Sequence, residues 1–224
     1  MEIHFGERPL AQTEAAASAL RRLAALLLSQ EQPQPVVEEM LPRFAEWERA
    51  LTATAPADAR PRVGDAEDDP ERRIYLDHAF DIGSYNPCFP EYVFDAIDPA
   101  SATGRVTFPV TFEGPPGLVH GGFLGVFFDC VVQQHSCAAG VTGKTRSLTI
   151  TYRRPTPLLT ELTFSIERTA TEAGIESQAL LRHGAEVLCR AVVATVAATP
   201  ERLTGTRYGH RRAPGTPTTE RIPR

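Results

Sequence analysis

The sequence predicts an α+β protein in which a curved antiparallel sheet wraps around one long central helix, with a helical extension before it. Three observations predict this class. Residues 119–139 form one long apolar helix candidate. Runs of residues with strand character lie on both sides of it in the chain. A helix that is apolar on nearly every side must be surrounded, and a curved sheet can do this.

Composition limits the possible functions. The chain has 224 residues, of which 42% are hydrophobic, and its net charge is −5. This allows one domain of ordinary size with appendages and argues against nucleic acid as a partner. The four cysteines show no metal-ligand spacing, so we expect small buried thiols in a reducing compartment. With no secretory signal at the start, we expect a cytoplasmic protein.

The first predicted segment, residues 1–73, is a helical extension with a linker. Residues 10–53 contain two runs with helical spacing of apolar residues, separated by Pro33 and Pro35. The leucine-rich part of the first run contains Arg21 and Arg22 and is too short to span a bilayer, so we expect no membrane span. Residues 54–73 have the composition of a linker.

The second predicted segment, residues 74–199, carries the sheet and the central helix. Gly140 is the expected end of that helix. Gly174 and Gly184 mark expected hairpin turns. Residues 200–224 are rich in Arg, Thr, Pro and Gly, and we expect a flexible tail. The predicted strands cover residues 92–97, 103–112, 145–153, 160–169, 174–183 and 186–198.

The start of the central helix is the first candidate for chemistry. Gly121 and Gly122 follow His120 and open the helix, so backbone N–H groups there are accessible to a substrate. Such groups can stabilise negative charge that develops on a carbonyl oxygen. A tight turn is the simpler explanation of two glycines. His120 is expected to hold the preceding loop and shape the pocket.

Asp129 is the second candidate, because it is the only charged residue between His120 and Lys144. An unpaired acid in an apolar helix is costly. It lies on a narrow polar stripe that also carries Gln133. An acid that only fixes the helix orientation is the alternative. Thr145 begins the next predicted strand, where its hydroxyl could orient the carboxylate, although strand propensity alone also explains a threonine.

Helix geometry separates the two candidates. Asp129 lies seven positions after Gly122, which corresponds to about 10 Å of helix rise. A general base must lie about 3 Å from the water that it activates. Asp129 therefore cannot serve a carbonyl held by Gly122 of the same helix, and distance alone predicts an antiparallel dimer.

Arg153, Arg154 and Pro155 end the strand that follows the central helix. Paired guanidinium groups suit the phosphates of coenzyme A, and a solvated strand end is the competing interpretation. The chain has no Walker loop, GxGxxG, HExxH or GxSxG motif. We therefore expect neither a metal site nor a serine hydrolase.

Residues 85–199 resemble the hotdog-fold acyl-CoA thioesterases, most closely the His-Gly-Gly type found in phenylacetate degradation and among thioesterase-superfamily members. One departure is Glu113 and Gly114, where some members have an amide side chain. The residues that carry the resemblance are Phe112 to Gly117, His120 to Gly122, Asp129, Thr145 and Tyr152 to Pro155.

The resemblance implies a homodimer, or a dimer of dimers, that hydrolyses acyl-CoA. In it the Gly122 amide polarises the thioester carbonyl, Asp129 acts as general base or nucleophile, and Thr145 assists. His120 belongs to the same site, and Gly121, Gln133, Arg153, Arg154 and Pro155 are expected to bind substrate. Coenzyme A is part of the substrate, and no other cofactor is implied.

Two alternatives share the fold. The first is a protein that binds acyl-CoA or an acyl carrier without turnover. The second is a hydratase or dehydratase of enoyl thioesters, which usually needs a His and an acid on one face. His135 lies six positions after Asp129, on another face of the helix, which disfavours that chemistry. The N-terminal helices could also recruit a partner.

Overall fold

The computed structural model describes residues 10–55, 81–139, 143–172 and 174–197. These residues belong to two compact units, of which one contains α1 (Ala11–Leu28) and the sheet, and the other contains α2 (Pro35–Ala53). The predicted boundaries near residues 73 and 200 lie outside the described residues. None of the described helices has the length and apolar character that a membrane crossing requires.

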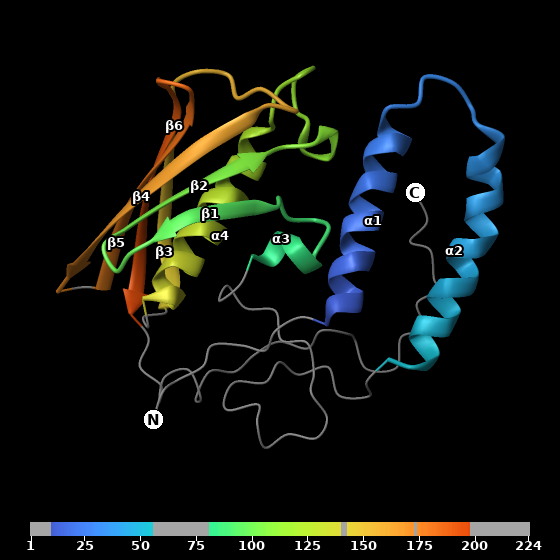
Figure 1. Ribbon diagram of the computed structural model, residues 1–224, viewed down its shortest axis with the longest axis horizontal. Helices are drawn as coiled ribbons and strands as arrows, with labels where there is room; N and C mark the ends of the chain where they lie inside the picture. Colours follow the sequence, from blue (N-terminus) through green and yellow to red (C-terminus); the bar gives the residue numbers. More distant parts are fainter. Residues whose placement is uncertain (1–9, 56–80, 140–142, 173, 198–224) are drawn as a thin grey trace. The chain divides into compact units, whose positions relative to one another are not determined.

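The described strands form one six-stranded antiparallel sheet in the order β1-β2-β4-β5-β6-β3. The long helix α4 (Gly121–Ala138) follows β2 in the chain and lies against the sheet (Figure 1). This is the predicted hotdog arrangement, and the α+β class is confirmed. The strands are β1 (Tyr92–Ile97), β2 (Ser101–Thr107), β3 (Gly143–Tyr152), β4 (Glu161–Thr171), β5 (Gly174–His183) and β6 (Glu186–Ala197).

The core lies between α4 and the sheet because each contributes an apolar face. Alternate residues of β2 and β4 are buried, as expected for strands with one covered side. Gly104 of β2 leaves room for a ring of β4, since a Cβ there would lie 2.4 Å from the Phe164 ring. Phe127 and Phe128 of α4 are fully buried against these strands. The packing of the helix against the sheet therefore buries apolar surface from both elements in one core.

The second strand is shorter than predicted. The expectation of a strand over 103–112 was wrong at its end, because β2 stops at Thr107 and Val110–Phe112 form a 3-10 turn. Pro109 has no N–H to donate to a sheet ladder. The turn also allows Phe108 and Phe112 to be buried together, with their ring centroids 6.1 Å apart.

Both predicted N-terminal helices are present. Pro35 is the first residue of α2, where a missing N–H has no cost. None of the α2 residues is buried within the described structure, and Trp47 and Leu51 remain exposed. Helix α1, in contrast, buries Ala17 and Arg21. It lies beside α3 (Ile82–Tyr85), a short helix that the sequence did not predict (Figure 1).

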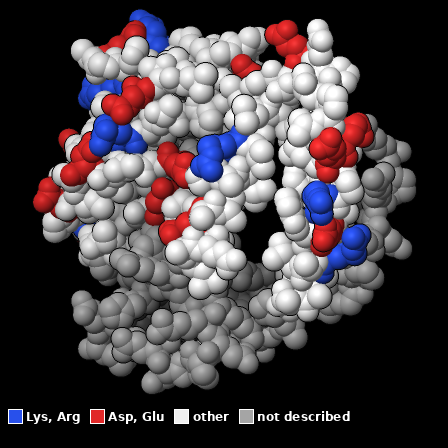
Figure 2. All heavy atoms as spheres, turned by 45° about the vertical axis from the view of Figure 1, so that its right-hand side comes forward, with Lys and Arg blue, Asp and Glu red and all other residues white. Residues whose placement is uncertain are grey.

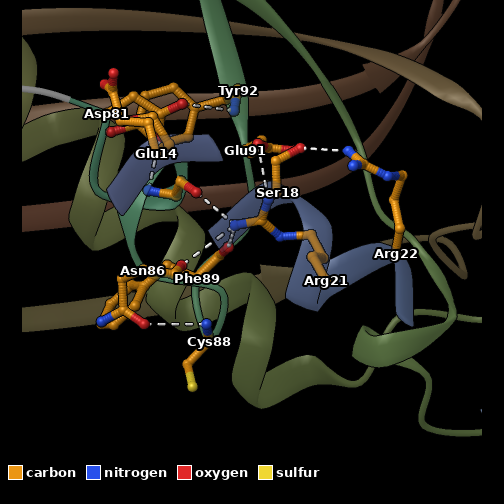
Figure 3. Close-up of polar contacts among 12 residues, drawn as sticks. Glu14, Ser18, Arg21, Arg22, Asp81, Asn86, Cys88, Phe89, Glu91 and Tyr92 are labelled. Atoms are coloured by element: carbon orange, nitrogen blue, oxygen red, sulfur yellow. Dashed lines mark hydrogen bonds and ion pairs between the residues drawn. The ribbon is translucent and has the colours of Figure 1, made fainter. Parts of the chain in front are cut away.

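Arg21 fixes α1 to the sheet unit, as Figure 3 shows. Its guanidinium donates to the carbonyl oxygen of Gly83 and to those of Asn86 and Phe89, each 3.3 Å away. It also forms an ion pair of 2.7 Å with Glu91. A buried guanidinium needs such partners, so α1 is docked through polar contacts in addition to its apolar face.

Candidate active site around the central helix

His120 determines how α4 begins. Its backbone is extended, and its Nδ1 accepts a hydrogen bond of 3.0 Å from the Gly122 N–H. With Nδ1 as the acceptor, Nε2 is the ring nitrogen left to carry an N–H. The side chain thus caps the helix that follows it, whereas the sequence-based expectation was that His120 holds the preceding loop. The hydrogen bond also means that the Gly122 amide is engaged by His120 in this structure.

Gly121 faces a different partner. Its carbonyl oxygen accepts a hydrogen bond of 2.9 Å from the Tyr152 hydroxyl at the end of β3. A Cβ at Gly121 would lie 3.1 Å from that oxygen, so glycine allows the close approach of helix and strand. Tyr152 is 56% exposed, which leaves its ring available to a bound molecule.

Asp129 and Thr145 meet although 16 residues separate them. The Thr145 hydroxyl donates to Asp129 Oδ1 over 2.6 Å, which is in the range of about 2.5–2.7 Å for bonds from a hydroxyl to a carboxylate. A β-bulge between Thr145 and Ser147 interrupts the pairing of β3 with β6. Bulges commonly redirect a side chain next to a functional site, and this one lies directly at Thr145.

Gln133 is placed behind this pair. Its Nε2 donates to Thr145 Oγ1 over 2.6 Å, and it is also 3.4 Å from Oγ1 of Thr195 on β6. Asp129 is half-buried and Thr145 is exposed, whereas Gln133 is only 3% exposed. The structure therefore joins Gln133, Thr145 and Asp129 into one chain of hydrogen bonds that leads from the interior to the surface.

A cavity of about 450 Å³ lies beside the start of α4. It is lined by the entry loop of the helix, by its first turn and by the segment that follows β3. Its lining residues are Pro115, Leu118, Val119, Gly121, Leu124, Tyr152, Arg153, Arg154, Pro155 and Thr156. The lining residues are mostly apolar and include two arginines, a combination that suits a ligand with an apolar and an anionic part.

The two arginines of this cavity differ. Arg154 forms an ion pair of 3.0 Å with Glu186. Within the described residues, the Arg153 guanidinium has no such partner, and its backbone N–H donates to the Leu188 carbonyl oxygen over 2.8 Å. Arg153 is therefore the cation at this site whose charge is not already matched. On the face drawn in Figure 2, the acidic and basic side chains of the described residues are interspersed.

The predicted site residues thus fall into two groups. One group is Asp129, Thr145 and Gln133, and the other surrounds the cavity and contains Gly121, Arg153, Arg154 and Pro155. His120 and Gly122 lie at the same helix start as the second group. Gly122 and Asp129 belong to one continuous helix, so about 10 Å of rise separates them within the chain.

Glu113, at the position where some members of the resembling family have an amide side chain, forms a hydrogen bond within its own loop. Its Oε1 accepts a hydrogen bond of 2.7 Å from the Gly117 N–H, in the loop before the helix. Gly117 has a φ of +77°, a conformation that favours glycine. The carboxylate therefore stabilises the Pro-Pro-Gly turn that leads to His120.

His135 lies away from both groups. It is fully buried, and its Nε2 is 2.7 Å from the carbonyl oxygen of Asp98. Burial lowers the pKa of this imidazole, so it stays neutral. A side chain in this position cannot take part in chemistry at Asp129, which disfavours the hydratase alternative.

Sequence reasoning missed the contribution of Tyr152. It was part of the motif that carries the resemblance, but its contact with Gly121 depends on how β3 crosses the start of α4. The available signal was the position of an aromatic residue directly before Arg153. Cys130 and Cys189 are buried as predicted, whereas Cys88 is exposed, contrary to the expectation for all four thiols.

No protein-family model matches the sequence. Among solved structures, the chain is similar to a thioesterase-superfamily protein with a TM-score of 0.68 and 24% identity, over 85% of this chain and 97% of the other. At this identity the similarity shows the fold.

Other matches cover about half of this chain. One is a thioesterase from Streptococcus pneumoniae TIGR4 solved with coenzyme A (TM-score 0.45, 16% identity, 48% of this chain and 88% of the other). Another is thioesterase superfamily member 2 from Mus musculus (TM-score 0.43, 13% identity, 47% of this chain and 80% of the other).

Proposed function

We propose that this protein hydrolyses acyl-CoA thioesters to the free acid and coenzyme A. The observation that carries the proposal is the hydrogen bond of 2.6 Å from Thr145 to Asp129, on the one helix that the sheet surrounds. A half-buried carboxylate that accepts a hydrogen bond from a hydroxyl at this distance can act as a general base. The hotdog fold, found also in a thioesterase-superfamily protein, agrees with this chemistry.

In the proposed reaction, Asp129 accepts a proton from a water molecule while the water oxygen attacks the thioester carbon. The carbonyl oxygen becomes negatively charged, and the N–H groups at the start of α4 stabilise it. The C–S bond then breaks, and coenzyme A leaves as the thiol after it takes up a proton. Direct attack by the Asp129 carboxylate is the second route that the same residues allow.

The Gly122 amide is the proposed donor to the carbonyl oxygen. Its N–H is bonded to His120 Nδ1, so the imidazole must turn away when substrate binds. His120 is exposed, and among the described residues its ring has a single hydrogen bond to lose. When the oxyanion replaces the imidazole nitrogen as the acceptor of the Gly122 N–H, the hydrogen bond becomes stronger because the new acceptor is negatively charged.

A homodimer completes this site. Gly122 and Asp129 of one helix lie too far apart to act on one carbonyl, whereas Asp129 of an antiparallel second helix could reach it. Strand β3 is at the edge of the sheet, and its side chains from Lys144 to Tyr152 are exposed or half-buried. An edge strand of ten residues offers unpaired N–H and C=O groups for pairing with a second copy.

The cavity beside α4 is the proposed binding site for the substrate. The apolar lining from Leu118 and Leu124 suits the apolar part of an acyl thioester. Arg153 is the proposed partner for a phosphate of coenzyme A because its charge is unmatched. Arg154 and Pro155 border the same space.

The test is release of free thiol from a panel of acyl-CoAs, aliphatic and aromatic. We expect turnover by the wild-type protein, and a loss of about 10²–10⁴-fold in kcat for Asp129→Asn, the range that general-base catalysis contributes. The variant should keep its circular dichroism spectrum and its oligomeric state. Tight binding of acyl-CoA without thiol release by the wild type would instead indicate a binding protein.

A further inference from the structure

Gln133 occupies an unusual position for a polar residue. It lies on the polar stripe of α4, yet it is 3% exposed and does not face solvent. Its Nε2 is bonded to two hydroxyls, those of Thr145 on β3 and Thr195 on β6. Thr195 is also buried. A buried amide is costly without such partners, so this environment is specific for a side chain with N–H donors.

The direction of each hydrogen bond follows from the available protons. An ionised Asp129 can only accept, so Thr145 must give its single hydroxyl proton to Oδ1. The lone pairs of the Thr145 oxygen are then free to accept a hydrogen bond. Gln133 Nε2, at 2.6 Å, is the donor there, and no rotation of the hydroxyl satisfies both neighbours in another way.

We propose that Gln133 is a positioning residue for the hydrolysis, acting through Thr145. Its N–H holds the Thr145 hydroxyl in the one orientation that donates to Asp129, and this fixes which carboxylate oxygen remains free to accept the proton of the water. Thr195 anchors the amide from the other side. This inference rests on the proposed function, and it assigns Gln133 to the support of the base instead of to contact with substrate.

The position of Thr145 explains why such support is needed. Thr145 is exposed and lies at a β-bulge, where the regular pairing of β3 is interrupted. Its hydroxyl could otherwise donate to solvent from another staggered rotamer. The buried Gln133 restricts the Thr145 side chain to one rotamer, because its N–H donates to the Thr145 hydroxyl from α4, on the interior side.

A double-mutant cycle tests the inference with the full-length protein. The variants are Gln133→Met, Thr145→Val and the double variant, with Thr195→Val as a comparison. We expect Gln133→Met to lower kcat about tenfold or more with little change in KM. The variant loses a hydrogen bond in the chain that ends at the Asp129 carboxylate, but it loses no contact with substrate. In the Thr145→Val background the same substitution should have almost no further effect.

Additive losses in the cycle would overturn the inference, because they would mean that Gln133 acts independently of Thr145. Thr195→Val should lower kcat less than Gln133→Met, since its bond is longer. Circular dichroism and size-exclusion chromatography of each variant identify any loss of fold, and a variant that unfolds is replaced by Gln133→Asn, which keeps the amide but cannot reach Thr145.

A second measurement does not depend on turnover. The side-chain ¹⁵N–H₂ resonances of Gln133, assigned by their absence in Gln133→Met, should shift in Asp129→Asn. They should not respond to Asp129→Asn when Thr145 is valine. If Asp129→Asn does not shift these resonances either with Thr145 or with valine at position 145, the inference is overturned. If the wild type cleaves no thioester, the proposed function fails, and these resonances still decide whether Gln133 holds Thr145.

Discussion

At the scale of single residues, the candidate site combines side chains from segments that lie apart in the sequence. Asp129 comes from the middle of α4, whereas Thr145 is placed by the bulge at the start of β3. The sequence predicts both candidates, since an acid among apolar residues and a threonine at a strand start are visible in the pattern. It does not predict the burial of Gln133, because a helical stripe gives a direction around the helix and not a depth.

The two neighbouring arginines allow a matched test of substrate binding. We expect Arg153→Ala to raise KM for acyl-CoA about tenfold, because a free guanidinium that contacts a phosphate is lost. Arg154→Ala should have a smaller effect, since that charge is already paired with Glu186. The measurement is KM for acyl-CoA with each variant, with kcat as the control.

A substrate that lacks the nucleotide sharpens this comparison. With an acyl thioester of a short pantetheine analogue, Arg153→Ala and the wild type should have the same KM. Equal effects of the two arginine variants on acyl-CoA would contradict the assignment of Arg153 to a phosphate.

The bounds of helices and strands match the sequence-based prediction where local residue pattern and burial in the core favour the same structure. The strands over 92–97 and 174–183 were predicted with their observed bounds, because runs with strand character are flanked there by turn residues. The end of β2 was not predicted, because the burial of Phe108 and Phe112 in one core is a long-range requirement. Helix α3 was missed for a similar reason, since four residues carry no periodic signal.

A titratable carboxyl, that of Asp81, lies where α1 packs against α3. Asp81 caps α3 by accepting a hydrogen bond of 2.9 Å from the Gly83 N–H. It also accepts one of 3.4 Å from the Tyr92 N–H (Figure 3). Burial raises the pKa of this carboxyl from 3.8 to about 7, and the nearby Glu91 adds to the shift. Hydrogen bonds from the Tyr92 and Gly83 N–H groups and the charge of Arg21 oppose it.

This shift predicts a pH-dependent stability. Between about pH 4 and pH 7 the unfolded chain has released the Asp81 proton, whereas the folded protein keeps it. The folded state then binds more protons, so the contribution of Asp81 to the free energy of unfolding falls as the pH rises through this range. Asp81→Asn should remove that slope, and the melting temperature measured from about pH 5 to pH 8 should fall more for the wild type. Parallel curves would contradict the raised pKa.

At the scale of the whole molecule, β3 is an edge strand of the described sheet, and the two parts of the proposed site lie at the start and in the middle of α4. Strand order places β3 at the edge, and only assembly of the sheet determines this, since no residue pattern in β3 identifies its neighbours. The separation of Gly122 from Asp129, in contrast, was predictable from helix rise alone. Both observations lead to a second copy of the chain, from which the remaining half of the site would come.

Hybrid dimers test this arrangement. Gly122→Pro removes the N–H while keeping a helical φ, and Asp129→Asn removes the base, so each variant alone should be inactive. Co-expressed with different tags, the two variants form hybrids in which one site has an intact amide from one subunit and an intact carboxylate from the other. Random pairing should restore about a quarter of the wild-type activity, since half of the dimers are hybrids with one working site of two.

Gly122→Ala is the matched control for these hybrids, because it keeps the N–H. A Cβ there would lie 3.1 Å from His120 Nδ1, and this exposed ring can move by the small distance required. We therefore expect Gly122→Ala to retain most of its activity on its own. If purified hybrids of Gly122→Pro and Asp129→Asn stay inactive while each subunit remains dimeric and folded, the amide and the carboxylate do not come from different subunits, and the shared site is wrong.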